Sequence, residues 1–123
     1  MKMQKYIQTG LGIKVKSIYL ASPYTHEDPE VMERRYLAAC LKASQLAKEG
    51  YFVYSPIAHW HPIAKLYGLP RDWNFWKKID RKAISILDEV WILKLEGWSI
   101  SVGLGNEVLI ARELHKPYIF IDP

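Results

Sequence analysis

The chain has 123 residues, of which 50% are hydrophobic and 24% are charged, and this size and composition predict one globular domain. It contains no apolar run near the roughly 20 residues that cross a bilayer, which argues against a transmembrane or membrane-bound protein. The net charge of +4 favours an anionic ligand, but the basic residues are scattered, which argues against nucleic-acid binding.

The N-terminal segment 1–16 has weak periodicity and two glycines, so we expect a loose tail or an added edge element before a domain at 17–123. Its interrupting lysines and the lack of a small-residue cleavage site do not fit a signal peptide. The single Cys40 lies in the apolar run YLAACLKA and is expected to be a small buried hydrophobe. A secreted domain of this size would often carry paired cysteines, so a lone cysteine favours the cytoplasm. Together these features predict a cytoplasmic protein.

Strands and helices alternate along the predicted domain. The expected strands cover residues 17–21, 51–55, 89–95 and 117–121, and the expected helices cover residues 29–48, 72–87 and 104–115. Pro29 suits a first helical turn, Gly50 is placed to end that helix, and Asp72 suits an N-cap. The segment 57–71 contains two prolines and Gly68, so it is expected to be irregular.

This alternation predicts an α/β fold with three layers, flavodoxin-like or Rossmann-like, in which helices cover both faces of a parallel sheet of about four strands. For the strand order 2-1-3-4, the winding reverses between the first and third strands. Ligands bind at the carboxyl ends of strands at such a reversal. The loops SPYTHEDP and EGWSISVG, which follow those two strands, are therefore the expected ligand-binding loops.

The stretch GWSISVGLGNE links the third expected strand to the third expected helix. Backbone N–H groups at a helix start lack partners within the helix and bind anions. Gly103 and Gly105 are expected to allow close approach and positive φ, while Ser99 and Ser101 offer hydroxyl donors. The loop therefore suits a phosphate, although a glycine-rich strand-to-helix turn is also common in α/β folds without any ligand.

Glu107 is expected in the first turn of that helix, where the helix dipole lowers its pKa and keeps it ionised. A nucleophile or a hydrogen-bond acceptor needs this charge, and a general acid does not. The alternative is that an early glutamate only stabilises the helix start.

Asp80 lies within the second expected helix, among apolar residues one, three and four positions away. We expect a partly buried carboxyl with a raised pKa, which can act as an acid near neutral pH. One ionised glutamate with one such aspartate is the pairing that glycosidic-bond cleavage uses. A solvated Asp80 that pairs with Lys77 or Lys82 is the open alternative.

The motifs IYLASPY, DRKAISILDEVWIL and SVGLGNEVLIA, in this order, resemble the nucleoside 2-deoxyribosyltransferase superfamily over residues 17–123. The chain is most similar to a branch of small, uncharacterised bacterial and phage domains, and it also resembles deoxynucleoside 5′-monophosphate N-glycosidases. The resemblance implies that Glu107 attacks the anomeric carbon, that Asp80 helps to protonate the leaving base, and that Tyr19 orients the nucleophile. It also implies a homo-oligomer, a dimer or larger, in which neighbours complete the site.

Ser101 departs from the transferases that act on free nucleosides, which carry an acid at this position. The monophosphate branch has a serine there that contacts phosphate. A hydroxyl can donate a hydrogen bond to a phosphate, whereas a carboxylate would repel it. The Gly-Gly-Arg loop of that branch is replaced by SPYTHEDP, however, so the choice between nucleoside and 5′-monophosphate stays open. The residues expected to bind the substrate are Ser22, Tyr24, Trp98, Ser99, Ser101, Gly103 and Gly105.

The sequence HWHP at 59–62 offers two histidines, but a metal site needs three or four converging ligands, so we expect neither a metal nor another cofactor. These histidines and Trp60 are expected to pack against neighbours. Trp91 is expected in the core, and Trp73 with Trp76 is expected to form an exposed pair at an oligomer interface.

The expected function is cleavage of the N-glycosidic bond of a (deoxy)nucleoside or its 5′-monophosphate, by hydrolysis or by transfer to a second base. A nucleotide-binding module without chemistry is the main alternative, and a domain for protein interactions is a third.

Overall fold

Four parallel strands form the central sheet in the computed structural model, which describes residues 6–9 and 12–123. The strands are β3 (Ser17–Ala21), β4 (Phe52–Tyr54), β5 (Glu89–Leu93) and β6 (Tyr118–Ile121). They lie in the order β4-β3-β5-β6, which is 2-1-3-4 along the chain, and every pair is parallel. The predicted fold class and strand order are confirmed.

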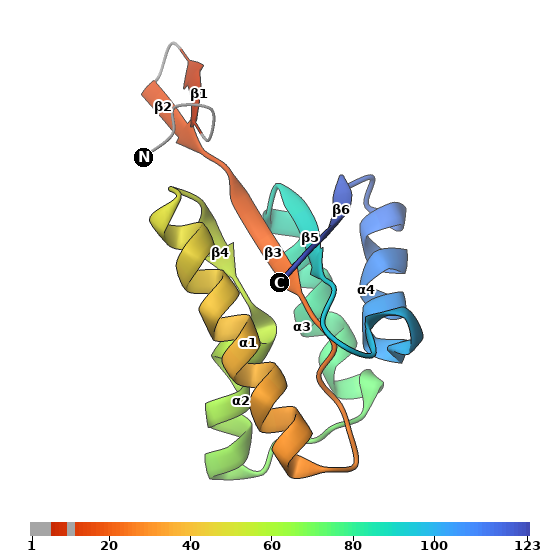
Figure 1. The fold of residues 1–123 in the computed structure, drawn as a ribbon. Helices are drawn as coiled ribbons and strands as arrows, with labels where there is room; N and C mark the ends of the chain where they lie inside the picture. The colour runs from red at the N-terminus through yellow and green to blue at the C-terminus, as the bar shows by residue number, and fades with distance from the viewer. Residues whose placement is uncertain (1–5, 10–11) are drawn as a thin grey trace.

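Helices cover both faces of this sheet (Figure 1). The α-helices are α1 (Pro29–Lys48), α2 (Pro56–Tyr67), α3 (Trp73–Ile86) and α4 (Val102–Glu113), and a short 3-10 helix, η2 (Trp98–Ile100), precedes α4. Helix α1 packs on one face, α3 and α4 pack on the other, and α2 contacts α1 and β3. The layered, Rossmann-like arrangement follows from strands that are buried on both faces.

The predicted helix ends agree closely with the structure. The Asp28 side chain caps α1 ahead of Pro29, and Gly50 follows the helix with a φ of 103°. Asp72 caps α3 by accepting a hydrogen bond from the N–H of Phe75. Cys40, expected to be buried, is half-buried on α1.

Helix α2 corrects the expectation that residues 57–71 are irregular. The Ser55 side chain caps its start, Pro56 occupies the first helical position, and Gly68 ends it with a φ of 65°. Pro62 inside the helix removes one backbone hydrogen bond, but capped ends and packing against α1 and β3 maintain the helix. Proline and glycine were expected to break regular structure in this segment, but Pro56 and Gly68 mark the two ends of a helix.

The N-terminal segment forms a hairpin of its own. Strands β1 (Tyr6–Thr9) and β2 (Gly12–Val15) pair antiparallel as a separate two-stranded sheet that projects beyond the start of β3 (Figure 1). Ion pairs of Lys14 with Asp88 and of Lys16 with Glu89 join its end to β5. Residues 1–5 and 10–11, part of the expected tail or edge element, lie outside the described residues. In the described part of the chain, no helix is long and apolar enough to span a membrane.

Strand β3 separates the two halves of the core. Leu20 packs with Leu46 and Leu93 on the α1 side. Tyr19 and Ala21, whose side chains point to the opposite face, pack with residues of α3 and α4. This alternation places the Tyr19 side chain on the face that also receives Asp80 and Glu107.

Candidate functional site

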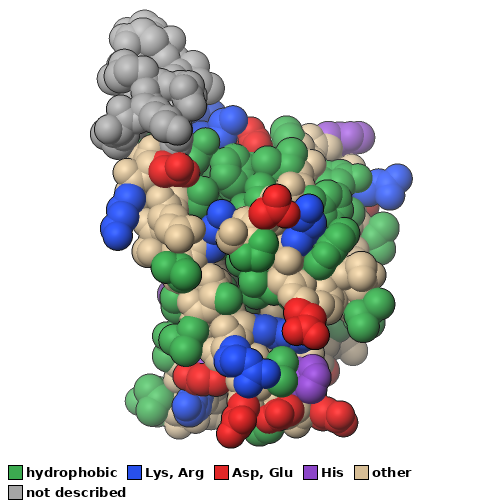
Figure 2. Space-filling view, in the orientation of Figure 1, with side chains coloured by type: hydrophobic (Ala, Val, Ile, Leu, Met, Phe, Trp, Pro, Cys, Tyr) green, Lys and Arg blue, Asp and Glu red, His purple; other side chains and the backbone are tan. Residues whose placement is uncertain are grey.

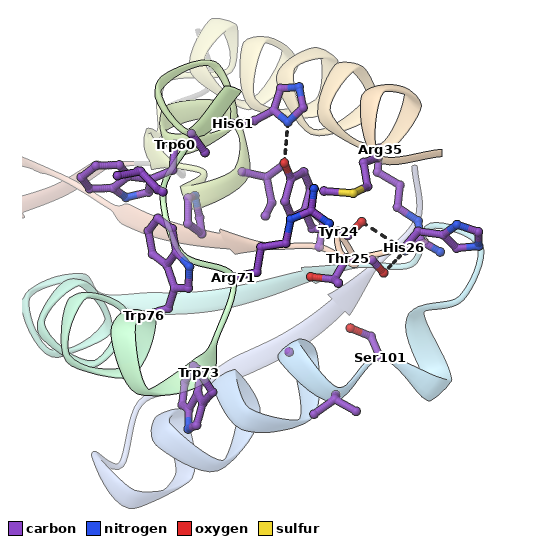
Figure 3. A pocket seen from close by; sticks show the side chains of 18 of the residues that line it. Tyr24, Thr25, His26, Arg35, Trp60, His61, Arg71, Trp73, Trp76 and Ser101 are labelled. Carbon is purple, nitrogen blue, oxygen red and sulfur yellow. Dashed lines mark hydrogen bonds between the residues drawn. The ribbon is translucent and has the colours of Figure 1, made fainter. Parts of the chain in front are cut away.

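A cavity of about 860 Å³ opens beside the carboxyl ends of β3, β4 and β5 (Figure 3). Its walls come from the loop after β3, from α2, from the loop between α2 and α3, and from the start of α4. This is where the strand order predicts a ligand, and the volume lies within the roughly 300–1,000 Å³ of small-molecule sites.

Three predicted catalytic residues meet at this cavity. Asp80 from α3 and Glu107 from α4 line it, and they are 8% and 7% exposed. The fully buried Tyr19 on β3 donates a hydrogen bond from its hydroxyl to Glu107 Oε2. The same hydroxyl interacts with Asp80 and lowers its pKa. Two buried carboxyls therefore share one hydroxyl neighbour.

The structure corrects the expected charge of Glu107. Helix α4 begins at Val102, so Glu107 is its sixth residue and lies beyond the first turn, where the helix dipole acts. Burial first, and then the charge of Asp80, raises the pKa of Glu107 to about 8, against the hydrogen bond from Tyr19. The expectation that the dipole keeps Glu107 ionised at neutral pH is therefore wrong.

Asp80 has the properties that its apolar neighbours predicted. Burial raises its pKa to about 6, although its interaction with Tyr19 opposes the shift. Among the described residues, the ion pairs do not include Asp80, Lys77 or Lys82, so the alternative of a solvated, lysine-paired carboxylate is wrong.

The start of α4 offers hydrogen-bond donors to the cavity. Ser101 caps the helix by accepting from the N–H of Leu104 at 3.2 Å, and Ser101, Val102 and Gly103 line the cavity. The N–H groups of Val102 and Gly103 have no acceptor within the helix. Gly103 and Gly105 are helical and lack the expected positive φ, which occurs instead at Gly97.

The other expected substrate-binding residues divide into two groups. Ser22 and Tyr24 line the cavity, and the buried Ser22 Oγ has no hydrogen-bond partner within the described part of the chain. Ser99 and Gly105 are exposed and do not line the cavity. Trp98 does not line it either, because it packs against Phe120 with ring centroids 5.4 Å apart.

Two arginines of the cavity were not predicted as site residues. The Arg35 guanidinium donates to the carbonyls of Thr25 and Glu96 at 3.1 and 3.2 Å, which joins the two loops at the strand reversal. Gly97 has a φ of 89°, which favours glycine, and a Cβ there would lie 2.7 Å from Arg35 Nη2 and displace the guanidinium. The Arg71 side chain extends into the cavity toward Tyr24 (Figure 3). Arg35 belonged to the scattered charges of the sequence, and no local pattern identifies either residue.

Tryptophans form another wall of the cavity. Trp73 and Trp76 line it and are half-buried, which corrects the expectation of an exposed pair. Trp60 meets Trp76 edge to face at 5.5 Å and donates from Nε1 to the Tyr54 hydroxyl at 2.9 Å. Trp91, expected in the core, is half-buried and packs on the α1 side. The cavity therefore offers aromatic surface on which a base can stack.

The histidines pack against neighbours, as expected. His61 is buried and binds Tyr24 and Glu33, while His59 packs against Tyr54 and Trp60. Among the residues that the structure describes, no cluster of three or more His, Cys, Asp or Glu could hold a metal ion. On the face in Figure 2, basic side chains are interspersed with acidic and hydrophobic ones and form no continuous stripe.

Comparison with known proteins gives a family without an assigned activity. Residues 16–122 match the model of a family described as "Domain of unknown function (DUF1937)". No curated protein matches the chain.

Proposed function

For this chain, which belongs to the DUF1937 family, we propose cleavage of the N-glycosidic bond of a (deoxy)nucleoside or its 5′-monophosphate. The observation that carries the proposal is the contact of Tyr19 with two buried carboxyls, Glu107 and Asp80, at the wall of a ligand-sized cavity. Burying two carboxyls without a cationic partner destabilises a fold, so their position there favours a chemical role.

In the proposed reaction, the Glu107 carboxylate attacks the anomeric carbon as the bond to the base breaks. Asp80 gives its proton to the departing base, and the sugar is held as an ester of Glu107. Water or a second base then attacks the same carbon and releases Glu107, and the proton of that nucleophile returns to Asp80. Hydrolysis and transfer differ only in this last nucleophile.

The proton count of the two carboxyls fits this reaction, but the proton must move. Between pH values of about 6 and about 8, the pair holds one proton, and the higher pKa of Glu107 favours its position there. Catalysis needs it on Asp80. The Tyr19 hydroxyl interacts with both carboxyls and can pass it between them, and positive charge developing on the sugar favours an ionised Glu107.

A 5′-monophosphate suits the cavity better than a free nucleoside. Arg71 extends into the cavity, and no ion pair within the described part of the chain includes Arg71 or Arg35. The Ser101 hydroxyl and the N–H groups of Val102 and Gly103 add donors at the start of α4. The aromatic wall at Trp60 and Trp76 would receive the base.

A nucleotide-binding module without chemistry is the second candidate, and the raised pKa of Glu107 favours it. A protonated carboxyl is not a nucleophile, and a pKa of about 8 leaves Glu107 mostly protonated at neutral pH. The burial of Asp80 favours the enzyme instead, since a module without chemistry has no use for a desolvated acid.

A panel of nucleosides and 5′-monophosphates, incubated with and without an acceptor base, tests the proposal. Free base released from at least one substrate supports the enzyme, and a new nucleoside formed only with the acceptor identifies transfer. Nucleotide binding measured by calorimetry, without any free base from a folded sample, supports the binding module. We also propose that the protein acts in the cytoplasm and that it is a homo-oligomer. Its mass in solution would test the oligomeric state.

A further inference from the structure

A buried histidine holds one wall of the cavity in a chain of hydrogen bonds. His61 on α2 is 8% exposed, and its Nδ1 lies 2.5 Å from the Tyr24 hydroxyl (Figure 3). Its Nε2 lies 2.7 Å from Glu33 Oε2. The Tyr36 ring stacks on the imidazole with centroids 4.3 Å apart and fixes its plane. The proposed bond cleavage uses none of these residues.

Glu33 determines the direction of both hydrogen bonds. The hydrogen bond from His61 holds the pKa of Glu33 below its usual value, so Glu33 is a carboxylate that can only accept. Nε2 of His61 therefore carries a hydrogen. In a neutral imidazole Nδ1 then only accepts, and the Tyr24 hydroxyl must be the donor to it.

The hydroxyl hydrogen of Tyr24 is thus already donated to His61 Nδ1 within the cavity wall. Burial raises the pKa of Tyr24 against the charge of Arg71, so the side chain stays a neutral hydroxyl with one hydrogen. In the described part of the chain, no other hydrogen bond reaches the Tyr24 hydroxyl oxygen. Toward a ligand Tyr24 is therefore an acceptor only, whereas a tyrosine without this partner both donates and accepts.

We propose that Tyr24, oriented by His61 and Glu33, selects ligands that present an N–H or O–H donor at this wall of the cavity. An exocyclic amine of the base or a hydroxyl of the sugar has this chemistry. A ligand carbonyl in the same place would bring its oxygen against the Tyr24 hydroxyl oxygen, and neither would have a hydrogen to donate. A site that offers only an acceptor therefore binds such a ligand weakly. The ligand class rests on the proposed function, but the inference concerns binding and not bond cleavage.

Equilibrium binding to matched ligands tests this inference, in the Glu107→Gln background where nothing is consumed. Adenosine and inosine 5′-monophosphates, and likewise the cytidine and uridine pair, exchange an amine for a carbonyl. Ribose and 2′-deoxyribose forms test the sugar hydroxyl. The donor ligand of one arm should bind about tenfold or more tightly than its matched partner. Tyr24→Phe should reduce that preference to about twofold or less.

Glu33→Gln tests the orienting role separately. A glutamine amide can donate or accept, so the imidazole can place its hydrogen on Nδ1 and free the Tyr24 hydrogen for the cavity. The preference for donor ligands should fall while the melting temperature changes little. Glu30→Gln removes the same charge from an exposed site on the same helix and should leave the preference unchanged.

The outcomes separate this inference from the proposed function. Equal binding within every matched pair, the ribose and 2′-deoxyribose pair included, or a preference that survives Tyr24→Phe, would overturn the inference even if the wild-type protein releases base. A preference lost in Tyr24→Phe, together with no base release by the wild type, would support the inference and overturn the cleavage. Binding of no ligand in the panel would overturn the inference as well.

Discussion

The Tyr19 hydroxyl donates a hydrogen bond to Glu107 and thereby joins the inner strand β3 to helix α4 beneath the cavity. Tyr19 is fully buried, and Glu107 is 7% exposed and takes part in no ion pair among the described residues. A neutral donor only partly offsets the desolvation of a carboxylate, which is why the pKa of Glu107 is raised. The contact therefore couples the charge of the proposed nucleophile to the stability of the fold.

Glu107→Gln should abolish turnover and stabilise the fold. The amide cannot form the ester, and this should cost several kcal/mol of barrier, where each ~1.4 kcal/mol is tenfold in rate. The folded-state pKa of about 8 exceeds the ordinary 4.5, so folded wild type retains a proton that the unfolded chain releases. Wild type therefore loses stability as the pH rises through this window, and the variant lacks this contribution of Glu107.

Melting temperatures from about pH 5 to pH 9 and initial rates of base release measure both effects. The variant should melt above the wild type at alkaline pH, and the gap should narrow toward pH 5. Glu113→Gln makes the same change on an exposed part of α4 and should alter neither quantity. A folded Glu107→Gln protein with near wild-type turnover would contradict the nucleophile assignment.

The sequence predicted the fold because its signals are local. Alternating apolar segments and capping residues such as Asp72 determine the elements, and right-handed crossovers restrict their order. The wrong expectation of an irregular segment at α2 also has a local cause, since residues such as Pro56 and Gly68 can either break a helix or mark its two ends. Packing of α2 on α1 decides between these readings, and the sequence does not show packing.

The candidate site could be predicted only in part. The spacing of Asp80 from apolar neighbours indicated its burial, and a resemblance assigned Glu107 and Tyr19. The actual helix start at Val102, two residues before the predicted one, places Glu107 beyond the first turn, and burial raises its pKa where ionisation was expected. Arg71 reaches the cavity from a loop whose path depends on α2, so no sequence pattern could identify it.

The rate of base release should depend on pH as a bell with limbs near 6 and 8. Below the pKa of Asp80, about 6, both carboxyls are protonated and no nucleophile exists. Above the pKa of Glu107, about 8, both are ionised and no acid remains. Measured kcat/KM from pH 5 to about pH 9 gives these limbs, which belong to the pair. Tyr19→Phe removes a bond that lowers both pKa values and should move both limbs upward, whereas limbs unmoved by it would contradict the coupling.

Arg71→Gln should weaken binding of a 5′-monophosphate more than binding of its nucleoside. A charge-assisted contact to phosphate contributes roughly 1.5–3 kcal/mol, which corresponds to a loss of affinity of about tenfold or more. Calorimetry with a matched nucleotide and nucleoside measures the difference. Lys82→Gln removes an exposed cation that does not line the cavity and should change neither affinity. Equal losses for both ligands would place Arg71 away from the phosphate.

Asp80→Asn should slow the release of an ordinary base and spare a base that needs no protonation. General acid catalysis contributes about 10²–10⁴-fold, so release of a neutral leaving base should fall by that factor. The base of N7-methylguanosine 5′-monophosphate already carries a positive charge and leaves without a proton. Its release by Asp80→Asn should stay within about tenfold of wild type. Glu107→Gln should lower the release of both bases, because attack on the sugar is needed whatever the leaving group.

Asp72→Asn is the matched control for this experiment, because asparagine caps a helix as well as aspartate and Asp72 lies at the start of the same helix. It should leave both rates unchanged. If Asp80→Asn slowed the release of both bases equally, Asp80 would act on the sugar or on Glu107 and not on the base. If Glu107→Gln in addition spared the charged base, the roles of acid and nucleophile would be exchanged, and the raised pKa of Glu107 would suit it to the role of the acid. The charged base therefore decides which of the two buried carboxyls delivers the proton.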